Sequence, residues 1–444
     1  MTVRKHFKQI VRERMKKTGE SYSSARRQIL KDTAQPSTDP RLRFHFPGSI
    51  PATTALRVIL GSAGVTDPAT GKPFSEAMLF GNAGGVGIGV AAFHYAKEDF
   101  SSFFISGRHL WYDDLAYLKA ALGRFGIKPI VKESGGAKTA EKQLREALEA
   151  GPCIAWVDMA HLPHRALPAA FSGGGYHVIT IYKIEDDHAW IGDLTDEPIR
   201  IALADLATSR ARIVKQKNRL LTIPNGTVCP PITSLVPAGL AACHKALSAK
   251  PGKGPLAMSS LDSLKKWADR LHGSKDKDAW EKIFRPGKNL WRGLTSIHLF
   301  IEMYGTGGGL SRPMMADFLK EAGESLKDNR FKKLADQYAD LGRGWSELAT
   351  AALPDSIPLM REAKELHNRY AELFTSGGPI EEKQQVWTRL DEVAKKTSVT
   401  FPLIETACEE LRADLQAKAR KLIAAEEAAL AGIVAVQGDG APAS

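Results

Sequence analysis

The chain has 444 residues, 43% of them hydrophobic and 25% charged, which is ordinary for a globular protein of two or three domains. No apolar run approaches the roughly 18 residues of a membrane-spanning helix, and the basic N-terminus lacks the apolar stretch of a secretory signal. The four cysteines form no CxxC pair, so we expect reduced thiols in a cytoplasmic protein, with no metal site and no cofactor.

The positive charge is concentrated at the N-terminus. Of the net charge of +11, residues 1–35 contribute +7 and the rest of the chain only +4. Apolar residues at helical spacing, a break at Gly19 and a second short helical pattern predict a basic helical hairpin over 1–35. Contact with nucleic acid is therefore expected only through this segment, which is also typical of a solvated amphipathic element or a homo-oligomer contact.

The segment 41–225 is predicted to be an α+β domain, with helices in its first half and strands in its second. The last three apolar, β-branched runs are separated by Asp and Gly turns and indicate an antiparallel meander. The predicted helices are 51–62, 74–80, 112–126 and 140–151, and the predicted strands are 101–106, 128–134, 152–159, 176–185, 188–194 and 197–203.

The segment 236–433 is predicted to be a helical domain, because long amphipathic stretches follow one another with Pro and Gly between them. Residues 434–444 are predicted to be a disordered tail. The predicted helices are 259–273, 290–304, 312–327, 330–352, 356–375, 380–396 and 401–433.

Two Gly-rich stretches could contact a substrate. The first, FGNAGGVGIGVAAF at 80–93, contains GxGxxA, but no strand precedes it. We interpret it as close packing or as a strained loop over a cleft, where Gly84 and Gly85 would contact substrate. The second, YGTGGGLSR, enters a helix. Its free backbone N–H groups, with Thr306 and Arg312, could hold a carboxylate or phosphate, and a tight interhelical turn is the alternative.

A third stretch, SGGGYHVITIYKIEDDHAWIGD, offers the residues of a catalytic pair. His177 opens a predicted strand and Asp193 ends the next one. Adjacent antiparallel strands can bring the two side chains together, and an Asp beside an imidazole fixes its tautomer. A structural His at a strand end is the alternative.

The motifs SIPATTALRVIL, EAMLFGNAGGVGIGV, GPCIAWVDMAHLP, GGGYHVITIY and IGDLTD, in this order, resemble the butirosin biosynthesis protein H N-terminal family. GTGGGLSRPMMADFL is similar to the helical domain of unknown function that usually follows it. The resemblance covers about 41–375, and the N-terminal segment lies outside it.

The resemblance implies a papain-like, cysteine-peptidase-related fold and an acyltransferase. Such an enzyme moves an aminoacyl chain from a carrier-protein thioester to a small amine through a Cys nucleophile. Residue by residue, the family's base falls on His177, its orienting acid on Asp193 and its cysteine on Pro51. The nucleophile is therefore missing, unless Ser49 replaces it.

Three functions follow from these residues. The first is an acyl or aminoacyl transferase, or an amide or thioester hydrolase, acting through His177, Asp193 and Ser49. The second is a catalytically silent protein that binds a ligand or partner in the former active-site cleft. The third is a nucleic-acid-associated regulator that uses the N-terminal segment.

Overall fold

The computed structural model describes residues 3–30, 39–68, 70–224, 226 and 229–437. The chain forms two compact units made of alternating segments. Unit 1 comprises residues 1–79, 114–232 and 368–388, and unit 2 comprises residues 80–113, 233–367 and 389–444. The sequence analysis divided the chain into consecutive parts instead, and those boundaries stay a prediction.

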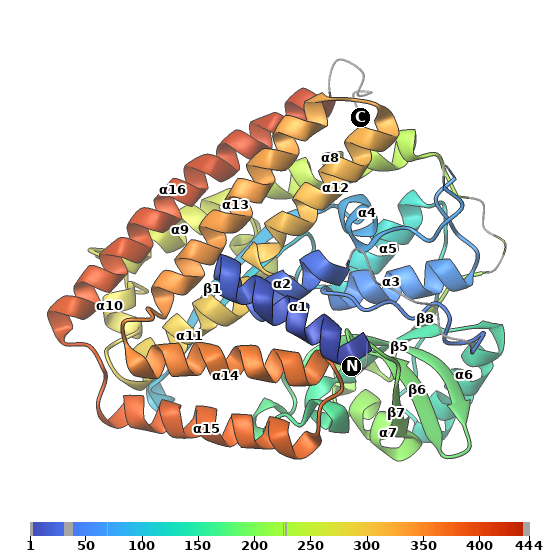
Figure 1. Ribbon diagram of the computed structural model, residues 1–444, viewed down its shortest axis with the longest axis horizontal. Helices are drawn as coiled ribbons and strands as arrows, with labels where there is room; N and C mark the ends of the chain where they lie inside the picture. The colour runs from blue at the N-terminus through green and yellow to red at the C-terminus, as the bar shows by residue number, and fades with distance from the viewer. Residues whose placement is uncertain (1–2, 31–38, 69, 225, 227–228, 438–444) are drawn as a thin grey trace. The chain divides into compact units, whose positions relative to one another are not determined.

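A six-stranded antiparallel sheet forms the centre of unit 1. Its strands β5, β6 and β7 lie side by side as the predicted meander (Figure 1), which is confirmed. Strand β8 was not predicted. In spatial order the strands are β3 Ile130–Lys132, β8 Leu220–Thr222, β4 Cys153–Asp158, β5 Tyr176–Glu185, β6 His188–Gly192 and β7 Ile199–Ala202.

Helices cover this sheet because its strands carry apolar side chains on both faces. The β4 residues and most of β5 are buried, as expected of central strands whose two faces are both packed. Helix α3 Pro51–Ser62 contacts β4 and β5, while α6 Ala137–Ala150 and α7 Leu203–Ala211 pack by Leu144 and Leu206 into the core beside Ile179. Helix α5 Asp114–Arg124 contacts α3.

The N-terminal segment contains two helices, α1 Val3–Thr18 and α2 Tyr22–Leu30, which contact each other within unit 1. Gly19 lies between them with φ 72°, a conformation that glycine adopts without strain. Residues 1–2 and 31–35 of the predicted hairpin lie outside the described residues.

In unit 2 the predicted Gly-rich loop is wrong over most of its length. Residues 86–95 form strand β1 Val86–Tyr95, which pairs antiparallel with β2 Phe100–Arg108. The glycines serve close packing: a Cβ on Gly87 would meet the Arg108 backbone oxygen at 2.7 Å, and one on Gly89 would meet the Trp111 ring at 2.3 Å.

The remainder of unit 2 is helical, and long helices α12, α13 and α16 run side by side (Figure 1). Each predicted helical segment of 259–433 contains a helix whose ends fall within about one turn of the prediction. The helices lying in unit 2 over nearly all of their length are α8 Ile232–Ser248, α9 Leu261–Leu271, α10 Trp280–Ile283, α11 Lys288–Glu302, α12 Arg312–Leu326, α13 Arg330–Ala352 and α16 Glu405–Gln437.

Three helices belong to both units, namely α4 Glu76–Asn82, α14 Pro358–Thr375 and α15 Ile380–Val399. Helix α16 continues through residues 434–437 of the predicted tail, and residues 438–444 lie outside the described part of the chain. Among the described helices, none is both long and apolar enough to cross a bilayer. The structure is α+β, as predicted.

His45, in the segment before α3, makes the stability of the fold depend on pH. Its Nδ1 lies 2.9 Å from the Tyr182 hydroxyl and its Nε2 lies 2.9 Å from the Thr195 carbonyl oxygen. Loss of hydration lowers the pKa of His45 to about 4. Between pH 6.5 and 4 the unfolded chain therefore binds a proton here that the folded chain does not bind.

We expect the free energy of unfolding to fall by about 1.4 kcal/mol per pH unit through His45 as the pH drops from 6 to 5. His45→Gln should remove this contribution and flatten the dependence, as measured by urea unfolding at both pH values. The control is His6→Gln on the exposed surface of α1. Equal slopes for wild type and His45→Gln would contradict the assignment.

Candidate functional site

Four side chains in unit 1 meet around one buried carboxylate. Asp193 Oδ1 lies 2.6 Å from His177 Nε2 and 2.6 Å from Arg165 Nη2. Asp193 Oδ2 lies 2.7 Å from both His164 Nε2 and Arg165 Nε. All four residues are buried, with 2–8% of each exposed. The predicted pair of His177 and Asp193 is therefore brought together, and two residues that the sequence analysis left out join it.

The chain supplies these side chains from three places on the sheet. His177 is the second residue of β5, and Asp193 follows the last residue of β6, so the β5–β6 pairing sets their separation. His164 and Arg165 belong to a short 3₁₀ turn, Pro163–Arg165, which follows β4. The turn ends at Ala166 with φ 49°, which turns the chain away from the cluster.

Arg165 and His177 compete for the same oxygen atom of Asp193. Arg165 Nη2 also lies 2.8 Å from His177 Nε2, so three polar atoms approach one another within hydrogen-bond distance. If His177 Nε2 carries a proton, it donates to Asp193. If it does not, it accepts from Arg165. In both cases the guanidinium, not an imidazolium, balances the charge of Asp193.

The charges follow from burial and from this contact. Burial alone would raise the pKa of Asp193, but Arg165 and the two imidazoles hold it well below its usual range. Burial lowers the pKa of His177, the Arg165 charge lowers it further, and Asp193 opposes both. Burial also lowers the pKa of His164. The cluster is thus an ionised carboxylate with one guanidinium and two neutral imidazoles.

Residues 368–388 hold the turn that carries Arg165. The Tyr370 hydroxyl donates to the Arg165 backbone oxygen at 2.8 Å, and Lys383 Nζ donates to the His164 backbone oxygen at 2.7 Å. The Arg165 guanidinium lies 4.4 Å from the centre of the Phe374 ring, a cation–π contact. These contacts fix Arg165 against Asp193.

The start of α3 holds a carboxylate from another helix. Ile50 is the N-cap, and Pro51 is at the first helical position. Glu76, in the first turn of α4, accepts hydrogen bonds from the backbone N–H groups of Ser49 and Ile50 at 2.8–3.1 Å. It also accepts from the Thr54 hydroxyl at 3.0 Å. A negative charge is stabilised here because the helix dipole is positive at this end.

Contacts of unit 1 connect the start of α3 with the cluster. The Thr53 and Tyr117 hydroxyl oxygens lie 3.3 Å apart, joining α3 to α5. Asp114, at the beginning of α5, acts electrostatically on the His177 imidazole. The sequence-predicted Ser49 precedes the N-cap of α3, with its backbone N–H on Glu76.

The other predicted substrate contacts lie in unit 2 and have structural roles there. Gly84 and Gly85 have φ of 106° and 59°, and a Cβ on them would meet His109 at 2.5 Å and Met315 at 2.9 Å. They form a packed turn before β1. Thr306 is buried and donates to the Ile301 backbone oxygen at 2.9 Å.

Arg312 is fully buried and is bonded within unit 2. Its Nε donates to Glu426 at 2.7 Å, and its Nη1 donates to the Leu310 backbone oxygen at 2.7 Å. Its Nη2 lies 3.3 Å from the Gly87 backbone oxygen. The guanidinium is occupied by the protein itself, which favours the structural turn over the predicted anion site.

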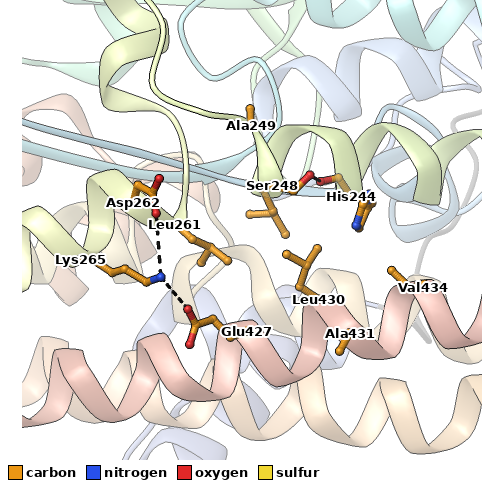
Figure 2. Close-up of a pocket in the computed structure, with 11 residues that line it drawn as sticks. His244, Ser248, Ala249, Leu261, Asp262, Lys265, Glu427, Leu430, Ala431 and Val434 are labelled. Atoms are coloured by element: carbon orange, nitrogen blue, oxygen red, sulfur yellow. Dashed lines mark hydrogen bonds and ion pairs between the residues drawn. The ribbon is translucent and has the colours of Figure 1, made fainter.

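A groove in unit 2 lies between α8, α9 and α16 (Figure 2). It encloses about 350 Å³, has an apolar floor and carries the ion pair of Lys265 and Glu427, 2.7 Å apart, at one end. None of the predicted site residues lines it. The lining residues are His244, Leu247, Ser248, Ala249, Leu261, Asp262, Lys265, Glu427, Leu430, Ala431 and Val434.

Neither a metal cluster nor a reactive thiol marks the described residues. No group of three or more His, Cys, Asp or Glu side chains is arranged to hold a metal ion there. Cys153 is fully buried in β4, and burial raises its pKa to about 12. It is an inert core residue, as its place in an apolar strand predicts.

The sequence analysis missed Arg165, His164 and Glu76. The stretch HLPHRALP places a charged residue beside two His in a short loop, which was a signal for a polar cluster. Glu76 lies in the first turn of the predicted helix 74–80 and looks like an ordinary first-turn acid. Its hydrogen bonds to the backbone at the start of α3 are tertiary contacts, which no local sequence pattern indicates.

Replacing Arg165 by Met keeps an unbranched side chain and removes the positive charge. Because that charge lowers the pKa of His177, we expect the pKa of His177 to rise in Arg165→Met, as measured by NMR titration of its Cε1 proton. Arg212→Met, which removes an exposed Arg bonded to Ser172, is the control and should leave it unchanged. An unchanged or lower pKa in Arg165→Met would contradict this account.

Comparison with protein families agrees with the motifs in the sequence. Residues 52–194 match the family described as "Butirosin biosynthesis protein H, N-terminal". The match begins immediately after Pro51 and includes both His177 and Asp193. Residues 202–373 match the family described as "Domain of unknown function (DUF4872)". No curated protein matches the chain. The chain thus contains a segment that matches the butirosin biosynthesis protein H N-terminal family, followed by a segment that matches this domain of unknown function.

Proposed function

We propose that this protein is a degenerate member of an acyl or aminoacyl transferase-type family, which binds its ligand without forming a covalent intermediate. The observation that carries the proposal is Pro51 at the first helical position of α3, the position at which the resemblance implies a cysteine nucleophile. The resemblance implies an acyl-carrier thioester or a small amine as the ligand, in a papain-like cleft.

Proline at this position removes two catalytic groups at once. It has no thiol, and it also lacks the backbone N–H that a residue at the first turn would offer to a developing oxyanion. The helix itself tolerates the substitution, because proline is favourable at the first helical position. The fold therefore survives a change that the covalent chemistry does not.

Glu76 opposes the same chemistry through its charge. Its carboxylate takes the N–H groups of Ser49 and Ile50, which are donors at the positive end of α3. An oxyanion or thiolate beside this carboxylate would be destabilised by like-charge repulsion. Ser49 as a replacement nucleophile meets the same obstacle.

Arg165 opposes covalent catalysis by making His177 a weaker general base. A general base has to accept a proton, and the imidazolium so formed is stabilised in a triad by a neighbouring carboxylate. Here the guanidinium of Arg165 neutralises Asp193 and lowers the pKa of His177. An enzyme that uses Ser49, His177 and Asp193 is the alternative, and the first experiment below separates the two.

We expect wild-type protein to form no covalent adduct with an acyl-carrier-protein thioester or with a fluorophosphonate probe, as measured by mass spectrometry of the intact chain. Parallel samples of His177→Ala and Ser49→Ala serve as controls. An adduct that forms in the wild type and is lost in both variants would establish Ser49 as the nucleophile and overturn the proposal.

A cysteine at position 51 tests whether this is the former nucleophile position. At pH 7 we expect Pro51→Cys to react with iodoacetamide about tenfold faster than Ala52→Cys, which faces a different side of α3. Position 51 lies at the positive end of α3, which favours a thiolate, whereas burial raises the pKa of a thiol at position 52. Equal rates for the two cysteine variants would contradict the assignment of position 51.

Removing the Glu76 charge should increase the reactivity of that cysteine further. In the Pro51→Cys background, Glu76→Gln keeps an amide oxygen to accept from the α3 backbone but removes the negative charge. We expect a thiol pKa lower by about 0.5–1 unit, hence alkylation about 3–10-fold faster at pH 7. The pH dependence of the alkylation rate measures this shift, and a raised thiol pKa would refute the role of Glu76.

A further inference from the structure

The basic residues of the N-terminal segment are bonded within unit 1. Arg12 pairs with Glu372 at 2.6 Å, Arg14 with Glu20 at 2.7 Å, and Arg26 with Asp196 at 2.6 Å. The charge that made this segment a candidate for nucleic-acid binding is therefore partly balanced by carboxylates of the same chain. The contacts of Arg26 are the most extensive and reach two segments next to the candidate site.

One guanidinium joins the segment before α3 to the segment after Asp193. Arg26 Nη1 donates to the Gly48 backbone oxygen at 3.1 Å. Its Nη2 donates to the Leu194 backbone oxygen at 3.2 Å and to Asp196 Oδ1 at 2.6 Å, and its Nε lies 3.2 Å from the same carboxylate. Only 4% of the Arg26 side chain is exposed, so solvent competes little for these bonds.

The two joined segments carry the residues on which the site depends. Gly48 lies three residues before Pro51, and Leu194 directly follows Asp193. Leu194 has φ 56°, a left-handed conformation that costs a branched residue energy and persists where its surroundings enforce it. The bond from Arg26 to the Leu194 carbonyl supplies such support beside the Asp193 carboxylate.

A second set of contacts fixes α2 in this place. The Tyr22 backbone N–H donates to Asn368 Oδ1 at 3.1 Å, and the Tyr22 hydroxyl lies 3.2 Å from Thr375 Oγ1. The Thr375 backbone oxygen accepts from the Asp196 N–H at 2.7 Å. Thus α2, the end of α14 and the segment after Asp193 form one hydrogen-bonded group.

We infer that Arg26 is a positioning residue of the candidate site, which holds the start of α3 in register with the Asp193 segment, and that α1 and α2 form an internal brace of this site. The inference rests on the proposed function only in taking the cluster of His177 and Asp193 as the binding site. A guanidinium suits the role because its planar fork donates from three separate nitrogen atoms to acceptors on both segments, whereas a lysine ammonium donates from a single nitrogen.

The test compares full-length wild type with Arg26→Gln and Arg26→Lys. In Arg26→Gln we expect amide hydrogen exchange to rise about tenfold or more in both 48–53 and 193–196, because one side chain supports both segments. The pKa of His177, followed by its Cε1 proton resonance, should move toward its ordinary value as the site loosens. Arg26→Lys keeps the positive charge near Asp196. Its exchange rates and its His177 pKa should therefore lie between those of the wild type and those of Arg26→Gln.

Arg14→Gln is the matched control, since it breaks an ion pair inside the N-terminal segment and touches neither joined segment. If Arg26→Gln resembles Arg14→Gln in exchange and in the His177 titration, the inference is overturned. If Arg26→Gln unfolds, Asp196→Asn decides, because it weakens one contact of Arg26 and keeps the two carbonyl bonds. Faster exchange in both segments then supports the inference, and exchange confined to 193–196 overturns it.

All of these variants keep Pro51, and neither hydrogen exchange nor the His177 titration requires a covalent intermediate. An adduct on Ser49 would overturn the proposed function and leave the positioning role of Arg26 intact. Independent behaviour of the two segments would overturn the positioning role and leave the consequence of Pro51 unchanged.

Discussion

The carboxylate of Asp193 is the group on which the remaining structure of the site depends. A carboxylate taken out of water is costly unless charge and hydrogen bonds replace its hydration, and Asp193 is only 2% exposed. Arg165 supplies the positive charge, and the imidazoles of His164 and His177 lie within hydrogen-bond distance of the Asp193 carboxylate. Arg165 in turn requires a fixed turn after β4, which Tyr370 and Lys383 provide. The cost of burying the Asp193 carboxylate thus explains contacts between residues that are far apart in the sequence.

The same interaction separates this site from a working triad. In a triad the carboxylate stabilises an imidazolium that forms during the reaction. Here Arg165 places a permanent positive charge beside Asp193, so the carboxylate is already neutralised. Burial and the Arg165 charge both lower the pKa of His177, which keeps its imidazole neutral. At the start of α3, Pro51 offers neither a thiol nor a backbone N–H, and the Glu76 carboxylate accepts from the Ile50 N–H. These three features support the proposed binding role.

Local patterns predicted the elements of this fold better than the contacts of its site. The strands of the β5–β7 meander were predicted because their periodicity and turns are local, and the pair of His177 and Asp193 followed from that meander. Strand β1 was missed because Gly87 and Gly89 conceal an apolar alternation. The contacts of Arg165, Glu76 and Arg26 could not be predicted, because the partners Asp193, Ile50, Leu194 and Asp196 lie 26 to 170 residues away and are brought close by tertiary packing. The ion pair of Arg312 with Glu426 could not be predicted either, because the two residues are remote in the sequence.

The proposed loss of the nucleophile raises the question of why His177 and Asp193 are present. The cluster gives both residues another reason to be present. Removing Asp193 would leave Arg165 as a buried cation without a counter-charge, a loss of about 3–5 kcal/mol for a broken buried pair. Removing His177 would take away the imidazole that contacts both Arg165 and Asp193. Packing and electrostatics thus account for the pair without a reaction, and only a covalent adduct would show that it serves one.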